Sequence, residues 1–374
     1  MISERPVRVG VVGLGNFARS QHLPNIARMP DAHLVAVCDT NQEVLDTVAA
    51  EYGVPHRYSD ARRLLEQADV EAVVLTVRDD VQASMAIEAI RAGKHVYVEK
   101  PLSASPDDCL RVADAVAHSD CRLAVGYNKR FAPIYRTARE ILRENGGAGS
   151  IHLAMTDDAW RWAKNYPPGY LMTLDVCHLV DLVEWFSGSP IRTVYCRSSR
   201  PEEDMLLVTT RSGCVASIMF SGNDSMDSPK EYARLIGDRW SLTAEDYVEL
   251  HVHGLAGHPH SYRFSGHLQG TTPFLHRRLM EKQGIAGWRD IRRIAWELYT
   301  EQTDSQPTGL ETPFIPNFIR GQGWYDSLQS FLRSIHSGDT TDHVSAADAS
   351  RIARVMAAAL ESRRTGAVIT VNEE

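Results

Sequence analysis

The residues best suited to binding a nucleotide form a short turn near the N-terminus. The turn directly follows the apolar run Val7–Val12 and opens a helix-like stretch; it consists of Gly13, Leu14, Gly15, Asn16, Phe17 and Ala18. In such a turn the first glycine permits a tight bend, the second lets the backbone approach a pyrophosphate, and a small third residue lets the helix pack on the strand. The N–H groups at the helix start then favour a phosphate. A purely structural strand-to-helix turn is the alternative.

A carboxylate stands where the second apolar run ends. Asp39 follows the predicted strand His33–Val37 after one residue. An acidic residue at this place in a dinucleotide-binding fold binds the ribose hydroxyls of the cofactor. Because the same charge repels a 2′-phosphate, the sequence predicts NAD as the cofactor in preference to NADP.

A second group of reactive side chains ends a later apolar strand. Glu99, Lys100 and Pro101 come directly after the run His95–Val98. Ligands of open α/β sheets lie outside the carboxyl ends of the strands, so we expect Glu99 and Lys100 to face the nicotinamide end of the cofactor. Pro101 would fix the backbone beyond them. Taken alone, a Glu-Lys pair is more often solvated at the surface.

Alternating strands and helices would position these residues. Between Val7 and Val125 short apolar runs alternate with amphipathic segments of about 10–15 residues, as in parallel strands joined by crossover helices. The predicted strands are Val7–Val12, His33–Val37, Ala72–Thr76, His95–Val98 and Arg122–Val125. The predicted helices are Asn16–Ala27, Gln42–Glu51, Ala61–Gln67, Val81–Arg91 and Pro106–His118. This order predicts an α/β fold with a doubly wound parallel Rossmann sheet in a domain of residues 1–126.

The rest of the chain, residues 127–374, has the pattern of a second, α+β domain. Its predicted strands alternate apolar and polar residues, which suits a sheet with one covered face. They are Ser150–Thr156, Ile191–Cys196, Met205–Thr210, Cys214–Phe220, Tyr247–His253 and Ala367–Val371. The predicted helices are Ile134–Arg143, Trp324–His336 and Ala346–Ser362. The least periodic segment, Gly254–Pro313, is expected to form a long excursion or a partly mobile arm.

Composition limits the classes of partner. The 374 residues are 43% hydrophobic and 24% charged with a net charge of −8, which is ordinary for a globular domain and gives no electrostatic reason to expect nucleic acid or an anionic membrane. No apolar stretch approaches the roughly 20 residues that span a bilayer. The six cysteines are scattered without a Cys-x-x-Cys pair, so we expect reduced thiols and a cytoplasmic protein.

Several segments together resemble the Gfo/Idh/MocA oxidoreductases, the group of glucose-fructose oxidoreductase and inositol dehydrogenase. They are the Gly13–Ala18 turn with His22 and Pro24, Glu99-Lys100-Pro101, Gly126-Tyr127-Asn128-Lys129-Arg130-Phe131, Asp175-Val176-Cys177-His178 with Asp181, and Glu361–Gly366. The resemblance implies an N-terminal dinucleotide domain and a C-terminal domain with a large open, mostly antiparallel sheet. Many members of the group oxidise sugars or cyclitols. A C-terminal segment that packs back on the Rossmann domain is also compatible with the pattern.

The resemblance also implies roles for two catalytic residues. Lys100 matches the lysine that contacts substrate and cofactor and helps to move the hydroxyl proton, and His178 matches a histidine that faces the same substrate oxygen from the second domain. Both side chains suit this work, because a lysine beside a positively charged nicotinamide has a lowered pKa and a histidine titrates near neutrality. A satisfied core histidine is the alternative for His178.

The sequence departs from the family pattern at two places. The family's aspartate four residues before the histidine is Leu174 here, and the acid is Asp175, which could orient His178, touch substrate or cap a helix. After the fourth strand Thr76 is kept, but Val77 and Arg78 replace the usual proline and asparagine. We still expect Thr76, Val77, Arg78 and Gln82 to contact the cofactor.

Candidate substrate contacts gather before the predicted His178 helix. Sugar rings stack on aromatic side chains and bond to polar ones, so this loop is a candidate substrate wall, with core tryptophans as the alternative. Its members are Trp160, Arg161, Trp162, Lys164 and Tyr166, and the resemblance adds Asn128 and Arg130. The histidines 251, 253, 258 and 260 have no acidic or cysteine ligand beside them in the pattern, so we expect a solvent-facing strand and loop and no metal.

These observations predict an NAD-dependent enzyme that transfers a hydride between nicotinamide and a secondary alcohol or ketone carbon. The expected substrate is a sugar, an amino sugar or a cyclitol. Two alternatives stay open: an NAD-requiring glycosidase or epimerase with transient oxidation, and a non-catalytic NAD-binding regulator. The free face of the long alternating sheet predicts a homodimer or homotetramer.

Overall fold

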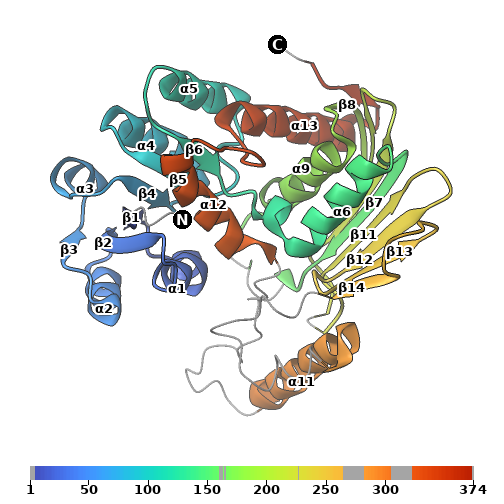
Figure 1. The fold of residues 1–374 in the computed structure, drawn as a ribbon, viewed down its shortest axis with the longest axis horizontal. Helices are drawn as coiled ribbons and strands as arrows, with labels where there is room; N and C mark the ends of the chain where they lie inside the picture. Colours follow the sequence, from blue (N-terminus) through green and yellow to red (C-terminus); the bar gives the residue numbers. More distant parts are fainter. Residues whose placement is uncertain are drawn as a thin grey trace. The chain divides into compact units, whose positions relative to one another are not determined.

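The computed structural model describes residues 5–159, 163, 166–225, 227–263, 282–304 and 322–372, and its chain forms two compact units (Figure 1). Unit 1 contains the chain up to Asn128 together with Trp324–Arg354. Unit 2 contains Lys129–Gly323 and the chain from Val355 on. A stretch near the C-terminus is therefore part of the N-terminal unit.

Unit 1 is built on a six-stranded sheet in which all neighbouring strands are parallel. The strands are β1 (Val7–Val12), β2 (Ala32–Cys38), β3 (His56–Tyr58), β4 (Ala72–Leu75), β5 (His95–Val98) and β6 (Leu123–Val125). Their order, β3-β2-β1-β4-β5-β6, reverses between β1 and β4, the switch point where ligands of doubly wound sheets bind. The predicted doubly wound sheet is confirmed. The short β3 was not predicted because its residues form no apolar run.

The helices of unit 1 follow the predicted order with two differences. They are η1 (Ala18–His22), α1 (Leu23–Ile26), α2 (Gln42–Tyr52), α3 (Ala61–Gln67), α4 (Asp79–Arg91), α5 (Pro106–Ala117) and α12 (Trp324–Ser337). The first predicted helix is not a continuous α-helix, because η1 is a π-helical turn. Helix α4 begins two residues before the predicted Val81, since Asp79 and Asp80 in its first turn complement the helix dipole.

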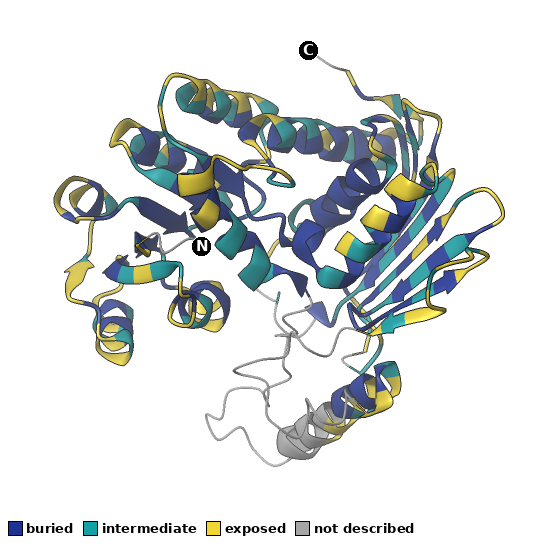
Figure 2. Cartoon of the chain, in the orientation of Figure 1, coloured by how far each residue is buried: buried dark blue, intermediate teal, exposed yellow. Residues whose placement is uncertain are grey.

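Helix α12 completes the hydrophobic core of unit 1. Leu328, Phe331 and Leu332 of this helix are buried in one cluster with Val9 and Val11 of β1. Figure 2 shows the visible side of α12 mostly in teal and yellow, because the buried residues of this helix lie on its other side. Burial of such side chains stabilises each by roughly 1.5–3 kcal/mol, so the core of unit 1 depends on residues more than 300 positions from β1.

Unit 2 is built on a nine-stranded sheet. Its strands are β7 (Ser150–Thr156), β8 (Ile191–Arg200), β9 (Glu203–Thr210), β10 (Val215–Ser221), β11 (Glu231–Ile236), β12 (Ser241–Glu245), β13 (Glu249–His253), β14 (Ser261–Arg263) and β15 (Ile369–Thr370). The order is β14-β13-β12-β11-β7-β10-β9-β8-β15, and among the described strands of this sheet only β7 and β10 pair in parallel. The predicted large, mostly antiparallel sheet is confirmed.

Two helices of unit 2, α6 (Pro133–Glu144) and α9 (Val176–Ser187), lie against one face of this sheet in Figure 1. The unit also contains α8 (Leu171–Leu174), and the short turn η2 (Asn128–Phe131) precedes these helices. Helix α13 (Ala346–Thr365) is divided between the two units. Strand β9 alternates as predicted: Leu206 and Val208 are buried, whereas Met205 and Leu207 on the other face are 52% and 50% exposed.

Two predictions in unit 2 are wrong. The predicted strand Tyr247–His253 starts only at Glu249, because Asp246 and Tyr247 form a tight turn with φ of 47° and 61° between β12 and β13. No glycine marks this turn; the Asp246 carboxylate holds it by accepting the backbone N–H groups of Lys230 and Glu231. This interaction joins distant segments and leaves no local pattern.

The second correction concerns the least periodic segment, Gly254–Pro313, which was predicted to form a long excursion or a partly mobile arm. It contains α11 (Ile285–Asp304), a 20-residue helix. Trp288 and Ile291 of α11 are buried against Val248, and Ile285 packs beside them. The three-residue spacing of Ile285, Trp288 and Ile291 is the helical signal that could have predicted this element.

Candidate active site

The glycine turn lies at the switch point of the parallel sheet. Gly13 follows β1 with φ of +88°, and a Cβ there would lie 2.6 Å from the carbonyl oxygen of Thr76. The Thr76 hydroxyl in turn donates to the carbonyl of Gly13. Glycine at position 13 is therefore required by the fold itself, and Thr76, which follows β4, holds the turn.

Gly15 differs from Gly13. A Cβ at Gly15 would meet no atom of the described chain within 4 Å, and its φ does not require glycine. Ala18, the third small residue, is fully buried as the pattern predicts. Because the fold gives no reason for a glycine at position 15, the open space beside it fits the close approach of a pyrophosphate.

The carboxylate of Asp39 is fixed beside this turn. One oxygen accepts the backbone N–H of Leu14 at 2.7 Å, and the other accepts that of Asn41 at 2.8 Å. Asn41 caps helix α2, so Asp39 connects the glycine turn to the start of that helix. Asp39 is half-buried at the carboxyl end of β2, which fits its predicted contact with ribose.

The residues after β4 divide into two groups. Arg78 is exposed, and its guanidinium donates to the carboxylate of Asp80 at 2.6 and 3.1 Å. Gln82 is buried, and its amide donates to the carbonyl of Pro101 at 2.7 Å. Gln82 is thus tied to the backbone that follows Lys100. Its predicted contact with the cofactor, like those of Val77 and Arg78, stays a prediction.

Glu99 is buried, so the view of Glu99 and Lys100 as a solvated surface pair does not hold for it. Its carboxylate contacts Nε2 of His22 at 2.7 Å, and its second oxygen accepts the backbone N–H of Lys100 at 3.2 Å. The Lys100–Pro101 peptide bond is cis, and Lys100 is half-buried. The structure therefore places Lys100 at the carboxyl end of β5 on a backbone bonded from both sides.

In unit 2, the predicted catalytic histidine lies on helix α9, which is buried on all sides. His178, Asp181 and Glu184 are the buried polar residues of this helix, at spacings of three residues that keep them near one face. Arg130 donates to the carboxylate of Asp181 at 2.6 to 3.1 Å, and the backbone N–H of Ile191 donates to Glu184 at 2.9 Å. Asp181 and Glu184 thus have structural partners within the unit.

Arg130 and Asn128 were predicted to bind substrate. Both are buried, with exposed fractions of 8% and 1%. The pair with Asp181 gives Arg130 a structural role, since an unpaired buried guanidinium would be costly. Its contact with substrate stays a prediction, as does that of Asn128.

Asp175 precedes helix α9, and its side chain makes no capping hydrogen bond to that helix. The structural-cap alternative is therefore wrong. Asp175 acts electrostatically on two lysines: burial lowers the pKa of Lys129 against the attraction of Glu231 and Asp175. For Lys230 burial also acts to lower the pKa, but Asp157 and Asp175 outweigh it and raise the pKa.

These lysines belong to a charged cluster that the sequence analysis missed. Lys129 is paired with Glu231 in the interior, and Lys230 is paired with Asp157. Asp157 follows β7, while Glu231 begins β11, and these two strands are neighbours in the sheet. Lys129 is part of the Gly126–Phe131 motif, so the sequence could have indicated it as a site residue. Its partner Glu231 could not be predicted, because the pairing depends on which strands are neighbours in the sheet.

The predicted substrate loop is only partly described. Trp160, Arg161, Trp162 and Lys164 lie outside the described residues. Tyr166 is 45% exposed and stacks on Tyr170, with ring centroids 5.2 Å apart and planes 9° from parallel. An exposed aromatic face of this kind fits the predicted stacking on a sugar ring.

Two further features do not belong to a catalytic site. His253 and His260 are exposed, as expected for a solvent-facing strand and loop, whereas His251 and His258 are half-buried. His251 lies 3.4 Å from Glu249, so the expectation that no acidic side chain accompanies these histidines is wrong. In the described ranges no three His, Cys, Asp or Glu side chains are grouped to hold a metal ion. None of the described helices has the length and apolar character needed to cross a bilayer.

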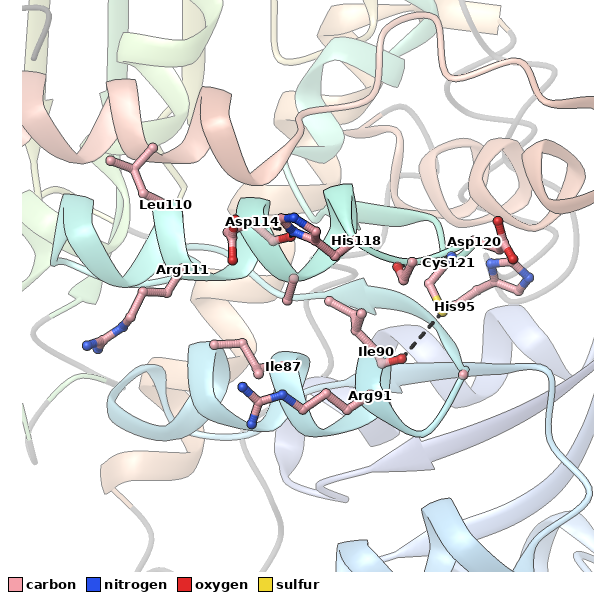
Figure 3. A pocket seen from close by; sticks show the side chains of 13 residues that line it. Ile87, Ile90, Arg91, His95, Leu110, Arg111, Asp114, His118, Asp120 and Cys121 are labelled. Carbon is pink, nitrogen blue, oxygen red and sulfur yellow. Dashed lines mark hydrogen bonds and ion pairs between the residues drawn. The ribbon is translucent and has the colours of Figure 1, made fainter.

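A cavity of about 930 Å³ lies between helices α4 and α5 (Figure 3). Ile87, Ile90 and Leu110 form part of its lining. His95 also lines it and begins β5, whereas Glu99 follows the other end of this strand. The cavity is therefore at the wrong edge of the sheet for a cofactor bound at the switch point.

Comparison with known proteins agrees with this geometry. Residues 7–127 match the model of the Gfo/Idh/MocA oxidoreductase family, described as an NAD-binding Rossmann fold. This segment belongs to that family. The match spans the whole six-stranded sheet, so the predicted resemblance is confirmed there, and unit 1 contains an NAD-binding Rossmann fold.

Individual relatives cover less of the chain. An uncharacterized oxidoreductase of Bacillus subtilis, YrbE, is 28% identical over 200 residues, which are 52% of this chain and 58% of the relative. The myo-inositol 2-dehydrogenase of Thermotoga maritima is 32% identical over 147 residues, or 39% and 43% of the two chains. The chain thus spans about half the length of these curated relatives.

A solved structure extends the likeness to both units. The scyllo-inositol dehydrogenase from Lactobacillus casei with bound NAD(H) and scyllo-inositol superposes with a TM-score of 0.74. The alignment covers 98% of this chain and 99% of that chain at 19% identity. This likeness shows the fold, including the second, mostly antiparallel sheet.

Proposed function

We propose that this Gfo/Idh/MocA protein is an NAD-dependent dehydrogenase that oxidises a secondary alcohol of a sugar, an amino sugar or a cyclitol, or reduces the matching ketone. The observation that carries the proposal is the position of Lys100 at the carboxyl end of β5, on the sheet whose switch point carries Gly13 and Gly15. The similar proteins of Thermotoga maritima and Lactobacillus casei, both inositol dehydrogenases, support the substrate class.

The chain's own residues would bind NAD through the turn at Gly13 and Gly15 and through Asp39. We assign Asp39 to the ribose hydroxyls, where its negative charge would disfavour the 2′-phosphate of NADP. Bound NAD would supply the hydride acceptor or donor. The fit rests on the open space beside Gly15 and on the fixed carboxylate of Asp39.

Removing a hydride from an alcohol carbon requires the hydroxyl proton to leave. We assign this proton transfer to Lys100 and His178. Asp175 would contact the substrate or His178. A positioned acid or base of this kind contributes about 10²–10⁴ to the rate. Tyr166 would stack on the apolar face of the ring, and the polar members of the predicted substrate wall would bond to its hydroxyls.

The test is a panel of cyclitols, aldoses and amino sugars incubated with NAD, with NADH absorbance and substrate loss both measured. Stoichiometric NADH formation is expected. Consumption of substrate without net NADH would instead support a glycosidase or an epimerase that returns the hydride. NAD binding without turnover of any tested compound would count for a regulator.

We propose further that the exposed face of the nine-stranded sheet packs against another copy of the chain in a dimer or tetramer. Met205, Leu207, Val215 and Ile236, all on this sheet, are between 39% and 52% exposed. Apolar side chains gathered on one face are typical of an interface. A monomeric mass by light scattering at micromolar concentration would argue against this assembly.

A further inference from the structure

A buried histidine and glutamate lie directly behind Lys100. His22 is 0% exposed, Glu99 is 7% exposed, and Nε2 of His22 is 2.7 Å from the Glu99 carboxylate. In the described part of the chain the other ring nitrogen, Nδ1, has no hydrogen-bond partner. The contact with Glu99 is thus the polar contact that orients this ring.

The Glu99 carboxylate is held on three sides. One oxygen meets His22, and the other accepts the backbone N–H of Lys100 at 3.2 Å. Gly126, which follows β6, forms the third side: a Cβ there would lie 3.0 to 3.2 Å from the carboxylate atoms. The carboxylate has little freedom to rotate, so the Lys100 N–H has a fixed acceptor.

His22 connects this carboxylate to the cofactor turn. It is the last residue of the π-helical turn η1, which starts at Ala18 of the nucleotide-binding pattern. Its ring meets those of Phe17 and Tyr97 edge-on, with centroids 5.3 and 5.7 Å away. Tyr97 is anchored in turn through its hydroxyl, 3.1 Å from Ser327 of α12. One short element therefore spans from the pyrophosphate position to the backbone of Lys100.

We propose that His22 and Glu99 are positioning residues that hold the Lys100 backbone at a fixed position relative to the cofactor turn. A lysine carries its amine on a flexible four-carbon stem, so proton transfer within hydrogen-bond reach needs a fixed starting point for that stem. Neither residue touches substrate in this role. The inference rests on the proposed function, because it assigns a purpose to the placement of Lys100.

The experiment compares His22→Phe, Glu99→Ala and Glu99→Gln in the full-length protein. His22→Phe and Glu99→Ala should each lower kcat about tenfold to a hundredfold, the scale of a small misplacement of a catalytic group. KM and the Kd for NAD should change by less than about twofold. Glu99→Gln should recover most of the loss, because its amide oxygen can still accept the Lys100 N–H.

The matched control is His95→Gln. His95 begins the same strand β5 at its opposite end, where its Nδ1 accepts the backbone N–H of Arg122 at 3.0 Å. This variant should alter stability and leave kcat in place. A kcat unchanged in both His22→Phe and Glu99→Ala, with folding intact, would overturn the inference and leave the proposed function standing.

Two further measurements test the role of His22 and Glu99. If the buried variants fail to fold, Gly126→Ala replaces them: its methyl group should displace the carboxylate by a few tenths of an ångström and lower kcat by about two- to fivefold, and unchanged kcat would overturn the inference. If the wild-type protein turns over no substrate, the proposed function fails separately. The hydrogen-exchange rate of the Lys100 backbone N–H then tests the positioning role. This rate should rise in Glu99→Ala, and an unchanged rate would overturn the positioning role.

Discussion

The site residues of the two units are held by different kinds of bond. In unit 1 they bond mainly to backbone: Thr76 donates to Gly13, Gln82 to Pro101, and Asp39 accepts from Leu14. In unit 2 oppositely charged side chains bond to one another, as in the pairs Arg130 with Asp181, Lys129 with Glu231, and Lys230 with Asp157.

The two kinds of interaction should make the stability of the two units respond differently to mutation. A hydrogen bond between side chain and backbone contributes about 0.5–1.5 kcal/mol. Breaking a buried ion pair by removing one partner costs about 3–5 kcal/mol, because an uncompensated charge is left in the interior. Unit 1 should therefore tolerate single losses that unit 2 does not, and pH should act more strongly on unit 2.

The largest expected effect comes from removing one catalytic candidate in each unit. Lys100→Ala should lower kcat by roughly 10²–10⁴, the usual contribution of a positioned acid or base, while NAD still binds through the untouched glycine turn. His178→Ala should also be impaired. The double variant should lose less than the product of the two single losses if both residues serve one step. Steady-state kinetics and an NAD titration measure these effects.

Lys94→Ala is the control, since Lys94 lies before β5 and donates to the carbonyl of Val70 at 3.0 Å. Full activity of Lys100→Ala toward the true substrate would refute the mechanism.

Asp175→Asn tests whether Asp175 of unit 2 takes part in the chemical step. A partner of His178 or of substrate should shift the pH–rate profile, and an unshifted profile would remove Asp175 from the chemical step.

The second prediction tests the two kinds of bond directly. Asp181→Asn should destabilise the protein by about 3–5 kcal/mol, because it leaves the Arg130 guanidinium buried without its counter-charge. Thr76→Val, which removes a bond to backbone, should cost only about 1 kcal/mol. Urea unfolding followed by circular dichroism measures both. Replacing both partners of the ion pair, as in Arg130→Met with Asp181→Leu, should recover part of the lost stability. Equal losses of stability in Asp181→Asn and Thr76→Val would contradict the difference between the two units.

A smaller effect is expected for Asp39→Ala. The variant should weaken NAD binding and lower the ratio of the Kd for NADP to the Kd for NAD about tenfold or more. A hydrogen bond to a charged group contributes about 1.5–3 kcal/mol. The Kd values for the two cofactors measure the ratio. Asn41→Ala removes the neighbouring helix cap without a change of charge and should leave the ratio alone. An unchanged ratio in Asp39→Ala would contradict the assignment of Asp39 to the ribose.

The smallest effect concerns pH and unit 2. Burial raises the pKa of Asp246, so the folded protein holds this proton more tightly than the unfolded chain. The contribution of Asp246 to stability is therefore full below its unfolded pKa of about 4 and is lost as pH rises through the raised value. A tenfold difference in proton affinity between the folded and unfolded states corresponds to about 1.4 kcal/mol.

Asp246→Asn should remove this slope from the free energy of unfolding measured between pH 4 and neutrality. Asp238→Asn is a control, because the Asp238 side chain is 86% exposed. Identical slopes in wild type and Asp246→Asn would show that the buried carboxylate does not titrate in this range.

Much of unit 1 could be predicted because its signals are local. A strand, a turn and a helix follow one another within about 20 residues, and parallel strands bring the ends at Gly13, Asp39, Thr76 and Glu99 to one edge of the sheet. Position along the chain is thus enough to predict proximity. The same local logic predicted alternation in β9, whose buried and exposed residues separate as expected.

The amino-acid sequence was enough to predict the nucleotide-binding turn, the parallel sheet and the placement of Lys100 at a strand end, since these depend on short-range pattern and on the twist of βαβ units. The tertiary structure alone decided which distant groups meet. It placed α12 in the core of unit 1, His22 against Glu99, and Glu231 against Lys129. The physical reason is that a buried polar group needs a partner wherever the fold provides one, and strand order, which no local pattern encodes, selects that partner.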